Sequence, residues 1–170
     1  IRSMSDAAKF CANYGLCPSS ARRDDDDDDD GSGGGVSQSS NDECDVSEYS
    51  RMRLSKTAHL LIDVRPRSHF SIYHLPGSRN VPLASLEDAL SNGILRGYVA
   101  DVRREAGLTI PSKDGDEMAF PIYVICLRGI KSRVAASNLR MRGWTSTRHI
   151  CGGLIRWKRD IDSTIPLYDG

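Results

Sequence analysis

One stretch, residues 121–133, constrains the fold of this chain more than any other, because a strand, a cysteine, a glycine-bearing loop and a helix follow one another there. Residues 122–125 form an apolar run rich in β-branched side chains, which is typical of a buried strand in a parallel sheet. Residues 132–142 are good helix formers, and Gly143 stands where a helix C-terminus favours glycine. The pattern therefore predicts that Cys126 lies where a parallel strand ends and a helix begins.

This position gives Cys126 a predicted chemical role. The first backbone N–H groups of a helix have no partner within the helix and carry the positive end of its dipole, so they stabilise a negatively charged sulfur. A loop of this kind directs several amides toward one point, and Arg128, Lys131 and Arg133 place positive charge nearby. We expect Cys126 to be a nucleophile whose sulfur is stabilised as an anion, although a small apolar residue at a strand end has the same pattern.

Four motifs, taken in order, resemble those of one protein family. The strand-Cys-x-x-Gly-x-x-Ser-helix arrangement around Cys126 is similar to the active-site loop of the rhodanese-like sulfurtransferases. Residues 60–66, 74–82 and 152–157 resemble the other motifs of that family in the expected order. The resemblance implies an α/β fold, a rhodanese-like sandwich with a central, mostly parallel sheet and helices on both faces.

The two ends of the chain narrow the resemblance to one branch of the family. Cys11, Cys17 and the tail at residues 161–168 are similar to the C-terminal sulfurtransferase domain of the adenylyltransferase and sulfurtransferase proteins, which activate ubiquitin-like sulfur carriers. The resemblance implies a ubiquitin-like sulfur carrier as partner, in tRNA wobble-uridine thiolation or molybdenum cofactor synthesis. ATP and zinc would belong to an upstream adenylyltransferase domain, and no cofactor is expected in this fragment.

The same resemblance assigns the site residues. Cys126 would be catalytic and would carry a persulfide received from a sulfane donor, either a persulfidated cysteine desulfurase or thiosulfate. The active-site loop would consist of Leu127, Arg128, Gly129, Ile130, Lys131 and Ser132. Asp63 and Arg65 would support this loop, and we expect a structural ion pair between them. No metal ligand is expected.

Three alternatives remain open at this stage. The branch commonly has Asn-Asp where this chain has Ile130-Lys131, and a cation there is similar to the stand-alone sulfurtransferases that use thiosulfate. Cysteine-dependent phosphatases use a similar loop with Arg six positions after the cysteine, but here that position is Ser132, and Arg133 comes one residue late. The third alternative is a non-catalytic binding module of the same fold.

Composition divides the chain into two parts. Residues 1–45 include a run of seven Asp residues and a Gly-Ser-rich segment, which predict a disordered linker, and residues 46–170 are predicted to form the rhodanese-like domain. Because the chain starts with Ile1 rather than Met, we expect it to be a fragment of a longer protein. Lys and Arg number 23, as do Asp and Glu, so no direct nucleic-acid partner is expected.

The remaining expectations concern location and secondary structure. No apolar run is long enough to span a membrane, and the five cysteines do not form a disulfide framework, so a cytoplasmic protein with reduced thiols is expected. Cys151 is expected to be buried, and His69 and His74 to be surface and turn residues rather than general bases. Helices are predicted at residues 46–54 with Tyr49 and Leu54 inward, and at 68–74, 85–95 and 98–106; strands are predicted at 59–64, 79–82 and 147–151.

Overall fold

The computed structural model describes residues 42–108 and 117–167, and the predicted linker lies almost wholly outside these residues. Its centre is a five-stranded sheet in the order β1-β5-β4-β2-β3, and every pair of neighbours is parallel. The strands are β1 (Glu43–Cys44), β2 (Leu60–Asp63), β3 (Ser78–Asn80), β4 (Ile122–Ile125) and β5 (Thr147–Ile150). The predicted α/β fold with a parallel sheet is confirmed.

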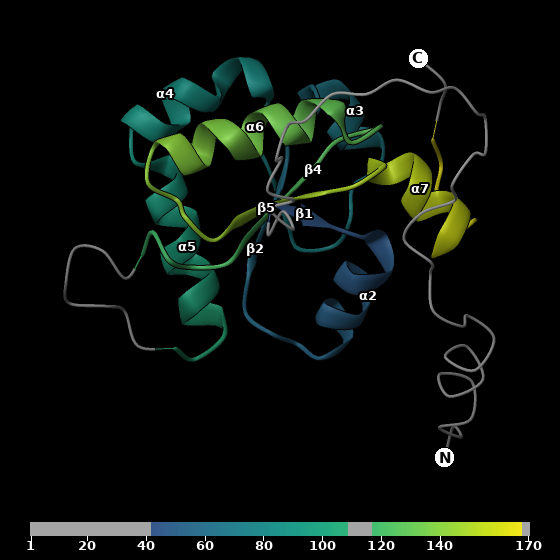
Figure 1. Cartoon of the computed structure of the whole chain (residues 1–170), viewed down its shortest axis with the longest axis horizontal. Coiled ribbons are helices and arrows are strands. Elements are labelled where there is room, and N and C mark those ends of the chain that lie inside the picture. Colours follow the sequence, from purple (N-terminus) through teal and green to yellow (C-terminus); the bar gives the residue numbers. More distant parts are fainter. Residues whose placement is uncertain (1–41, 109–116, 168–170) are drawn as a thin grey trace, which may run out of the picture. The chain divides into compact units, whose positions relative to one another are not determined.

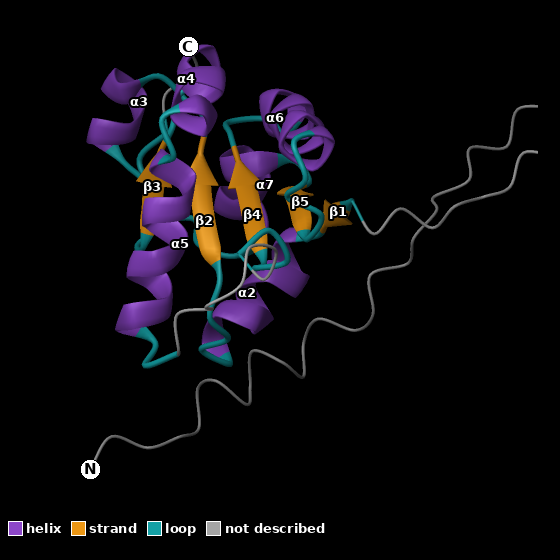
Figure 2. Ribbon diagram, turned by 90° about the vertical axis from the view of Figure 1, so that its left-hand side faces the viewer, coloured by secondary structure: helices purple, strands orange, loops and turns teal. Residues whose placement is uncertain are grey.

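Helices cover both faces of this sheet (Figures 1 and 2). They are α2 (Val46–Leu54), α3 (Arg67–Ile72), α4 (Leu86–Ser91), α5 (Ile94–Glu105), α6 (Ile130–Met141) and α7 (Gly153–Asp160), with a short 3-10 helix at Leu83–Ser85. Alternate side chains of the central strands enter two separate cores. Ile62 and Val124 lie in the core that contains residues of α4, α5 and α6, whereas Leu61 lies in the core that contains residues of α2 and α7.

The sheet extends further toward the N-terminus than the sequence predicted. Glu43 and Cys44 were assigned to the linker, but they form β1 and pair with His149 and Ile150 of β5. Asp45 caps α2, because its side chain accepts a hydrogen bond of 2.9 Å from the N–H of Ser47. A strand of two residues is too short to show an alternating pattern of side chains. Because its partner β5 lies about 100 residues away in the sequence, the residues around β1 do not indicate the pairing.

Other details of the structure also differ from the predictions. Helix α6 begins at Ile130 rather than at Ser132, so its first turn includes residues that were assigned to the loop. The predicted helix over residues 85–95 is two helices, because Gly93 adopts a left-handed conformation (φ 69°) between α4 and α5. Leu54 is 79% exposed at the end of α2, so its predicted inward position is wrong, whereas Tyr49 is buried as predicted.

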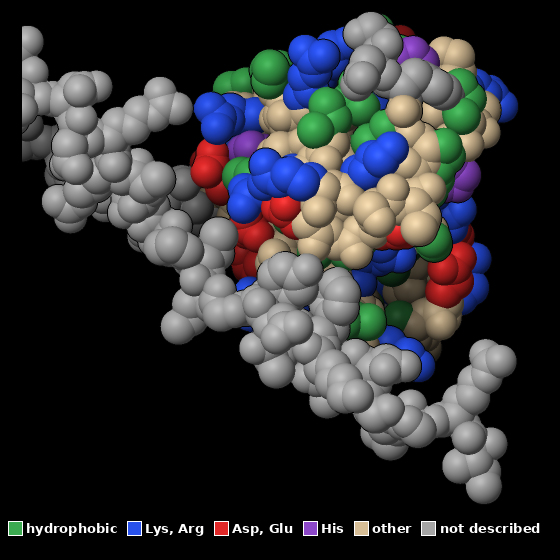
Figure 3. Space-filling model, turned by 90° about the vertical axis from the view of Figure 1, so that its right-hand side faces the viewer, with side chains coloured by type: hydrophobic (Ala, Val, Ile, Leu, Met, Phe, Trp, Pro, Cys, Tyr) green, Lys and Arg blue, Asp and Glu red, His purple; other side chains and the backbone are tan. Residues whose placement is uncertain are grey.

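The surface of the domain is mixed in charge. On the face drawn in Figure 3, Lys and Arg side chains are interspersed with Asp and Glu side chains, as expected from the equal numbers of the two kinds in the sequence. None of the helices in the described residues has the length and apolar character that a bilayer span requires.

Candidate functional site

Cys126 follows directly after β4, the central strand of the sheet, at the edge where the strands have their carboxyl ends. Ligand sites of open α/β sheets form at this edge. The carbonyl oxygen of Ile125 accepts a hydrogen bond of 3.0 Å from the N–H of Val64, which fixes the end of β4 against the segment after β2. Cys126 itself is only 2% exposed.

The sulfur of Cys126 is surrounded by hydrogen-bonding groups of the loop. Its Sγ accepts hydrogen bonds from the backbone N–H of Gly129 (3.1 Å) and of Ser132 (3.3 Å), and its thiol donates to Oγ of Ser132 (3.4 Å). We call these two N–H groups and the Ser132 hydroxyl the amide cradle. The hydroxyl of Ser132 also donates to the carbonyl oxygen of Gly129 at 3.0 Å, which ties the loop to the first turn of α6. The amide cradle can therefore stabilise a negative charge on the sulfur.

Gly129 makes this geometry possible. Its φ of 88° lies in the left-handed region that side chains other than glycine rarely adopt. A β-carbon at this position would also lie 2.7 Å from the backbone nitrogen of Gly152. The loop is thus packed directly on the backbone of the segment that leads into α7.

The start of α7 holds the loop by backbone hydrogen bonds. The backbone N–H of Leu154 donates to the carbonyl oxygen of Cys126 (2.9 Å), and the N–H of Ile155 donates to that of Leu127 (3.0 Å). Gly153 permits the close approach, because a β-carbon there would lie 2.3 Å from the carbonyl oxygen of Cys126. Two otherwise unpaired donors at the start of α7 are thereby satisfied by two loop carbonyls.

The other residues of the loop and of the first turn of α6 lie mostly at the surface. Leu127 is half-buried, whereas Arg128, Ile130 and Lys131 are exposed, and the exposed fraction of Ile130 is 70%. The sequence placed Lys131 at the last loop position before the helix; the structure places it inside α6.

Arg133 does not face the sulfur as a phosphate-binding arginine would. Its guanidinium forms an ion pair of 2.9 Å with the carboxylate of Glu43 on β1. At the sixth position after Cys126, the position that carries the arginine of cysteine-dependent phosphatases, the groups directed at the sulfur are the N–H and hydroxyl of Ser132. This arrangement disfavours the phosphatase alternative.

Asp63 and Arg65 form the predicted ion pair, and it is buried. Nη2 of Arg65 lies 2.7 Å from Oδ2 of Asp63, and the same guanidinium donates to the carbonyl oxygen of Tyr73 (2.6 Å). Asp63 is fully buried and also accepts a hydrogen bond from the N–H of Arg65 (3.0 Å). The amide of Asn80 donates to the carbonyl oxygens of both residues, each at 2.9 Å. The pair therefore fixes the segment after β2, which in turn contacts the end of β4.

The other described cysteines and His74 lie in different surroundings. Burial raises the pKa of the Cys44 thiol to about 12 and also raises the pKa of Cys151. Cys151 is only half-buried, so its predicted burial is partly wrong. Nδ1 of His74 lies 3.0 Å from the carbonyl oxygen of Phe70, as expected for a turn residue. Cys11 and Cys17 lie outside the described residues.

The geometry around Cys126 agrees with a comparison of the sequence with known families. Residues 45–160 match the Rhodanese-like domain family. The chain belongs to the rhodanese-like family. Its rhodanese-like domain is related to proteins named adenylyltransferase and sulfurtransferase.

Three such relatives show the extent of the similarity. The rhodanese-like domain is 37% identical over 121 residues to adenylyltransferase and sulfurtransferase MOCS3-1 of Zea mays, covering 71% of this chain and 22% of the relative. It is 38% identical over 124 residues to UBA4 of Candida albicans (71% and 24%) and 33% identical over 128 residues to MOCS3 of Oryza sativa (75% and 26%). The chain thus spans about a quarter of the length of the curated relatives it matches.

Solved structures share the fold of the rhodanese-like domain. The human single-domain sulfurtransferase TSTD1 aligns with a TM-score of 0.51 and 22% identity, over 69% of this chain and 95% of that chain. A rhodanese-like domain protein of Staphylococcus aureus aligns with a TM-score of 0.52 and 16% identity, over 75% and 99% of the two chains. At these identities the comparison concerns the fold alone.

The sequence did not reveal the contribution of α7 to the site. Gly152 and Gly153 were assigned to a final loop and helix of the family pattern, but their contacts with the loop of Cys126 are made between backbone atoms. Contacts between backbone atoms require few particular residue types, so the order of side chains in the sequence does not reveal them. The available signal was the glycine doublet itself, because two adjacent glycines before a helix indicate a close approach of another chain segment.

Proposed function

We propose that this domain is a sulfurtransferase that carries a persulfide on Cys126. The observation that supports the proposal is the amide cradle: two backbone N–H groups lie 3.1 and 3.3 Å from Sγ of a cysteine at the N-terminus of a helix. Such donors stabilise both the thiolate that attacks and the persulfide anion that results. Leu127, Arg128, Ile130 and Lys131 form the surface on which a donor or acceptor docks.

The first step of the reaction transfers one sulfur atom to Cys126. The thiolate attacks the outer sulfur of a sulfane donor, a new S–S bond forms, and the former partner of that sulfur leaves. With thiosulfate the leaving group is sulfite, and with a persulfidated cysteine desulfurase it is the thiolate of the desulfurase. The charge on the terminal sulfur of the persulfide is then stabilised by the amide cradle.

The second step delivers the sulfur to a ubiquitin-like sulfur carrier whose C-terminus has been adenylated. The terminal sulfur attacks the acyl carbon and AMP leaves; thiol reductants then cleave the acyl disulfide, which frees a thiocarboxylate and restores Cys126. Adenylation, with its ATP and zinc, would be the task of an upstream domain of the full-length protein, in the cytoplasm. The relatives named as both adenylyltransferases and sulfurtransferases support this assignment.

Intact-mass measurement tests the proposal. Protein incubated with thiosulfate or with a persulfidated desulfurase should gain the mass of one sulfur atom, and peptide mapping should locate it on Cys126. Cys126→Ala should abolish the adduct and preserve the fold, because the substitution removes only one sulfur atom from the end of a strand. An adduct on Cys44 or Cys151, or no adduct with either donor, would contradict the assignment, and the latter result would favour a binding module.

A further inference from the structure

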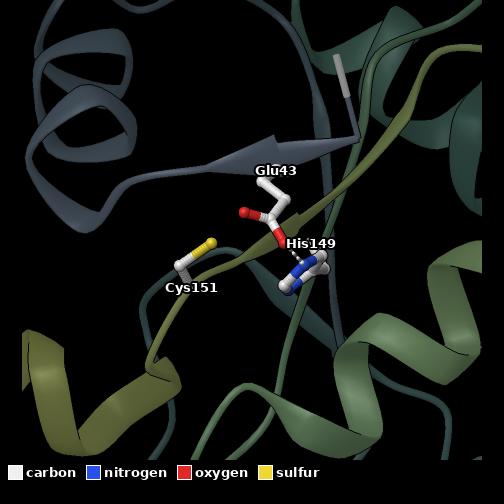
Figure 4. Close-up of side chains that lie close together, drawn as sticks. All are labelled: Glu43, His149 and Cys151. Atoms are coloured by element: carbon white, nitrogen blue, oxygen red, sulfur yellow. Dashed lines mark hydrogen bonds and ion pairs between the residues drawn. The ribbon is translucent and has the colours of Figure 1, made fainter. Parts of the chain in front are cut away.

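A second group of reactive side chains lies at the edge of the sheet, and the sulfurtransferase reaction proposed above does not use it. Glu43 on β1 lies opposite His149 on β5 in the strand register, and Cys151 follows β5 directly. A carboxylate oxygen of Glu43, a ring nitrogen of His149 and Sγ of Cys151 lie within 4.8 Å of one another. Figure 4 shows the three side chains directed toward a common point.

We propose that Glu43, His149 and Cys151 bind a zinc ion. Imidazole, thiolate and carboxylate are the three ligand types that zinc takes in proteins, whereas magnesium and calcium prefer oxygen alone. In a tetrahedral zinc site with bonds of about 2.0–2.3 Å, the donor atoms lie about 3.3–3.8 Å apart. Small side-chain rotations of Glu43 and Cys151 would therefore close the site, and water would supply the fourth ligand.

The surroundings of His149 support this assignment. The residue is 2% exposed, and Nδ1 has no hydrogen-bond partner among the described residues. Nε2 lies 3.3 Å from Oε1 of Glu43, which is a long contact for a buried imidazole. A buried ring with one orphaned nitrogen and one weak contact is under-satisfied in the metal-free protein. Coordination through Nε2, the ring nitrogen that lies beside Glu43, would replace this long contact with a strong bond.

A metal ion at this site would compete with Arg133 for the carboxylate of Glu43. The guanidinium of Arg133 lies 2.9 Å from Oε1 of Glu43, but the side chain of Arg133 is 69% exposed and that of Glu43 is 42% exposed, and solvent-exposed pairs contribute little to stability. Zinc would replace this ion pair, and the proton of the Cys151 thiol would pass to solvent. The ion would then connect β1 to Cys151, the residue directly before Gly152, on which the loop of Cys126 packs.

Cobalt(II) is the probe for this site, because a thiolate ligand gives cobalt an intense charge-transfer band in the near ultraviolet. The full 170-residue chain should carry Cys126→Ala, so that the thiol of Cys126 cannot bind the metal. The titration then tests the metal site alone, and its result does not depend on whether the proposed sulfur transfer is correct. We expect saturation at one equivalent of Co²⁺ and displacement of the cobalt by Zn²⁺. The matched control adds Cys11→Ser and Cys17→Ser, and its cobalt spectrum should be unchanged.

Three further variants in the same background identify the ligands. Cys151→Ser should abolish the charge-transfer band of cobalt. Cys151→Ser and His149→Gln should each weaken zinc binding by more than about 100-fold, because loss of a residue that only supports a metal ligand already weakens binding by about 10- to 100-fold. Zinc should raise the Tm of the parent protein but not that of Glu43→Gln, whose exposed side chain is not needed for folding. A charge-transfer band that survives Cys151→Ser, its loss in the Cys11 and Cys17 control, or no cobalt binding at all would overturn the proposal.

Discussion

The α-carbon of Gly129 packs so closely on Gly152 that a β-carbon at Gly129 would lie 2.7 Å from the backbone nitrogen of Gly152. The residue that gives the loop its left-handed turn is thus also the residue that lets the loop contact the start of α7. The two requirements are separable by experiment, because Gly77 has a similar φ (82°) with nothing within 4 Å of its β-carbon position.

Gly129→Ala and Gly77→Ala should therefore differ in activity. Each should lose about 1–2 kcal/mol of stability from the left-handed backbone. Only Gly129→Ala should also displace the loop or α7 and lose most of the persulfide loading of Cys126. Denaturant unfolding and intact mass measure the two effects, and equal loading of both variants would show that the contact with Gly152 does not matter for the amide cradle.

Removal of Arg65 should be severely destabilising because it leaves the buried carboxylate of Asp63 without a partner. Breaking a buried ion pair from one side costs about 3–5 kcal/mol, so Arg65→Met should lower the free energy of unfolding by about that amount. The double variant Asp63→Asn/Arg65→Met should lose less, since no buried charge remains. Urea titrations of the two variants provide the comparison, and a double variant less stable than the single one would refute this account of the pair.

Because the thiol of Cys44 is buried, the free energy of unfolding should fall as the pH becomes alkaline. The thiol of Cys44 is 1% exposed, and burial raises its pKa to about 12, whereas an unfolded cysteine ionises near about 8.5. The unfolded state therefore releases a proton that the folded state retains, and the stabilisation, complete below about pH 8.5, declines as pH rises toward 12. The difference in unfolding free energy between the native protein and Cys44→Ala should shrink between pH 8 and 10. A constant difference across this range would contradict the assignment.

Two N-terminal deletions should have different effects. Removal of residues 1–41 leaves β1 in place, and we expect no change in Tm. Removal of residues 1–45 also removes the buried side chain of Cys44 and the hydrogen bond from the N–H of Cys151 to the carbonyl oxygen of Cys44 (2.9 Å). It further removes the Asp45 cap of α2, and a helix cap of this kind contributes about 1 kcal/mol to stability. Calorimetry should show a lower Tm for the longer deletion, and equal values would mean that β1 adds nothing to the sheet.

Lys131 should affect the choice of sulfur donor. Its positive charge in the first turn of α6 attracts a small dianion, so Lys131→Asp should reduce thiosulfate use several-fold, and more at low ionic strength than at high. Transfer from a persulfidated protein should suffer less. Lys56→Asp makes the same charge change before the first residue of β2, at the edge of the sheet opposite to that of Cys126, and serves as the control. Equal losses with both donors would mean that Lys131 supports the loop rather than selecting the donor.

The sequence was most informative where one continuous stretch forms one element. The strand before Cys126, the loop and the helix after it were predicted because apolar pattern, glycine and helix formers lie side by side in residues 121–133. The ion pair of Asp63 and Arg65 was predictable for the same reason, since its partners are two residues apart. Within residues 121–133 only the first turn of α6 was misplaced, because Ile130 and Lys131 are equally acceptable in a loop and in a helix.

Features built by distant segments could not be predicted. Glu43 and His149 are opposite one another only because β1 adds to the outer edge of β5, and the composition around Glu43 is that of a linker. The ligands of the proposed zinc site, Glu43, His149 and Cys151, likewise come from separate segments, and their spacing matches no metal-binding motif. The contacts of α7 with the loop were missed because they join backbone atoms that any sequence contains.

The hydrogen bonds from Leu154 and Ile155 to Cys126 and Leu127 also impose an order on biosynthesis. A ribosome releases the cysteine and its loop well before it releases the residues that fasten them. On the growing chain the carbonyls of the loop still lack their donors, so the amides around the sulfur are not yet fixed in direction. If Cys126 carries sulfur as proposed, its thiol is prepared for this role only after α7 has emerged and folded, so an incomplete chain should not be loaded with sulfur.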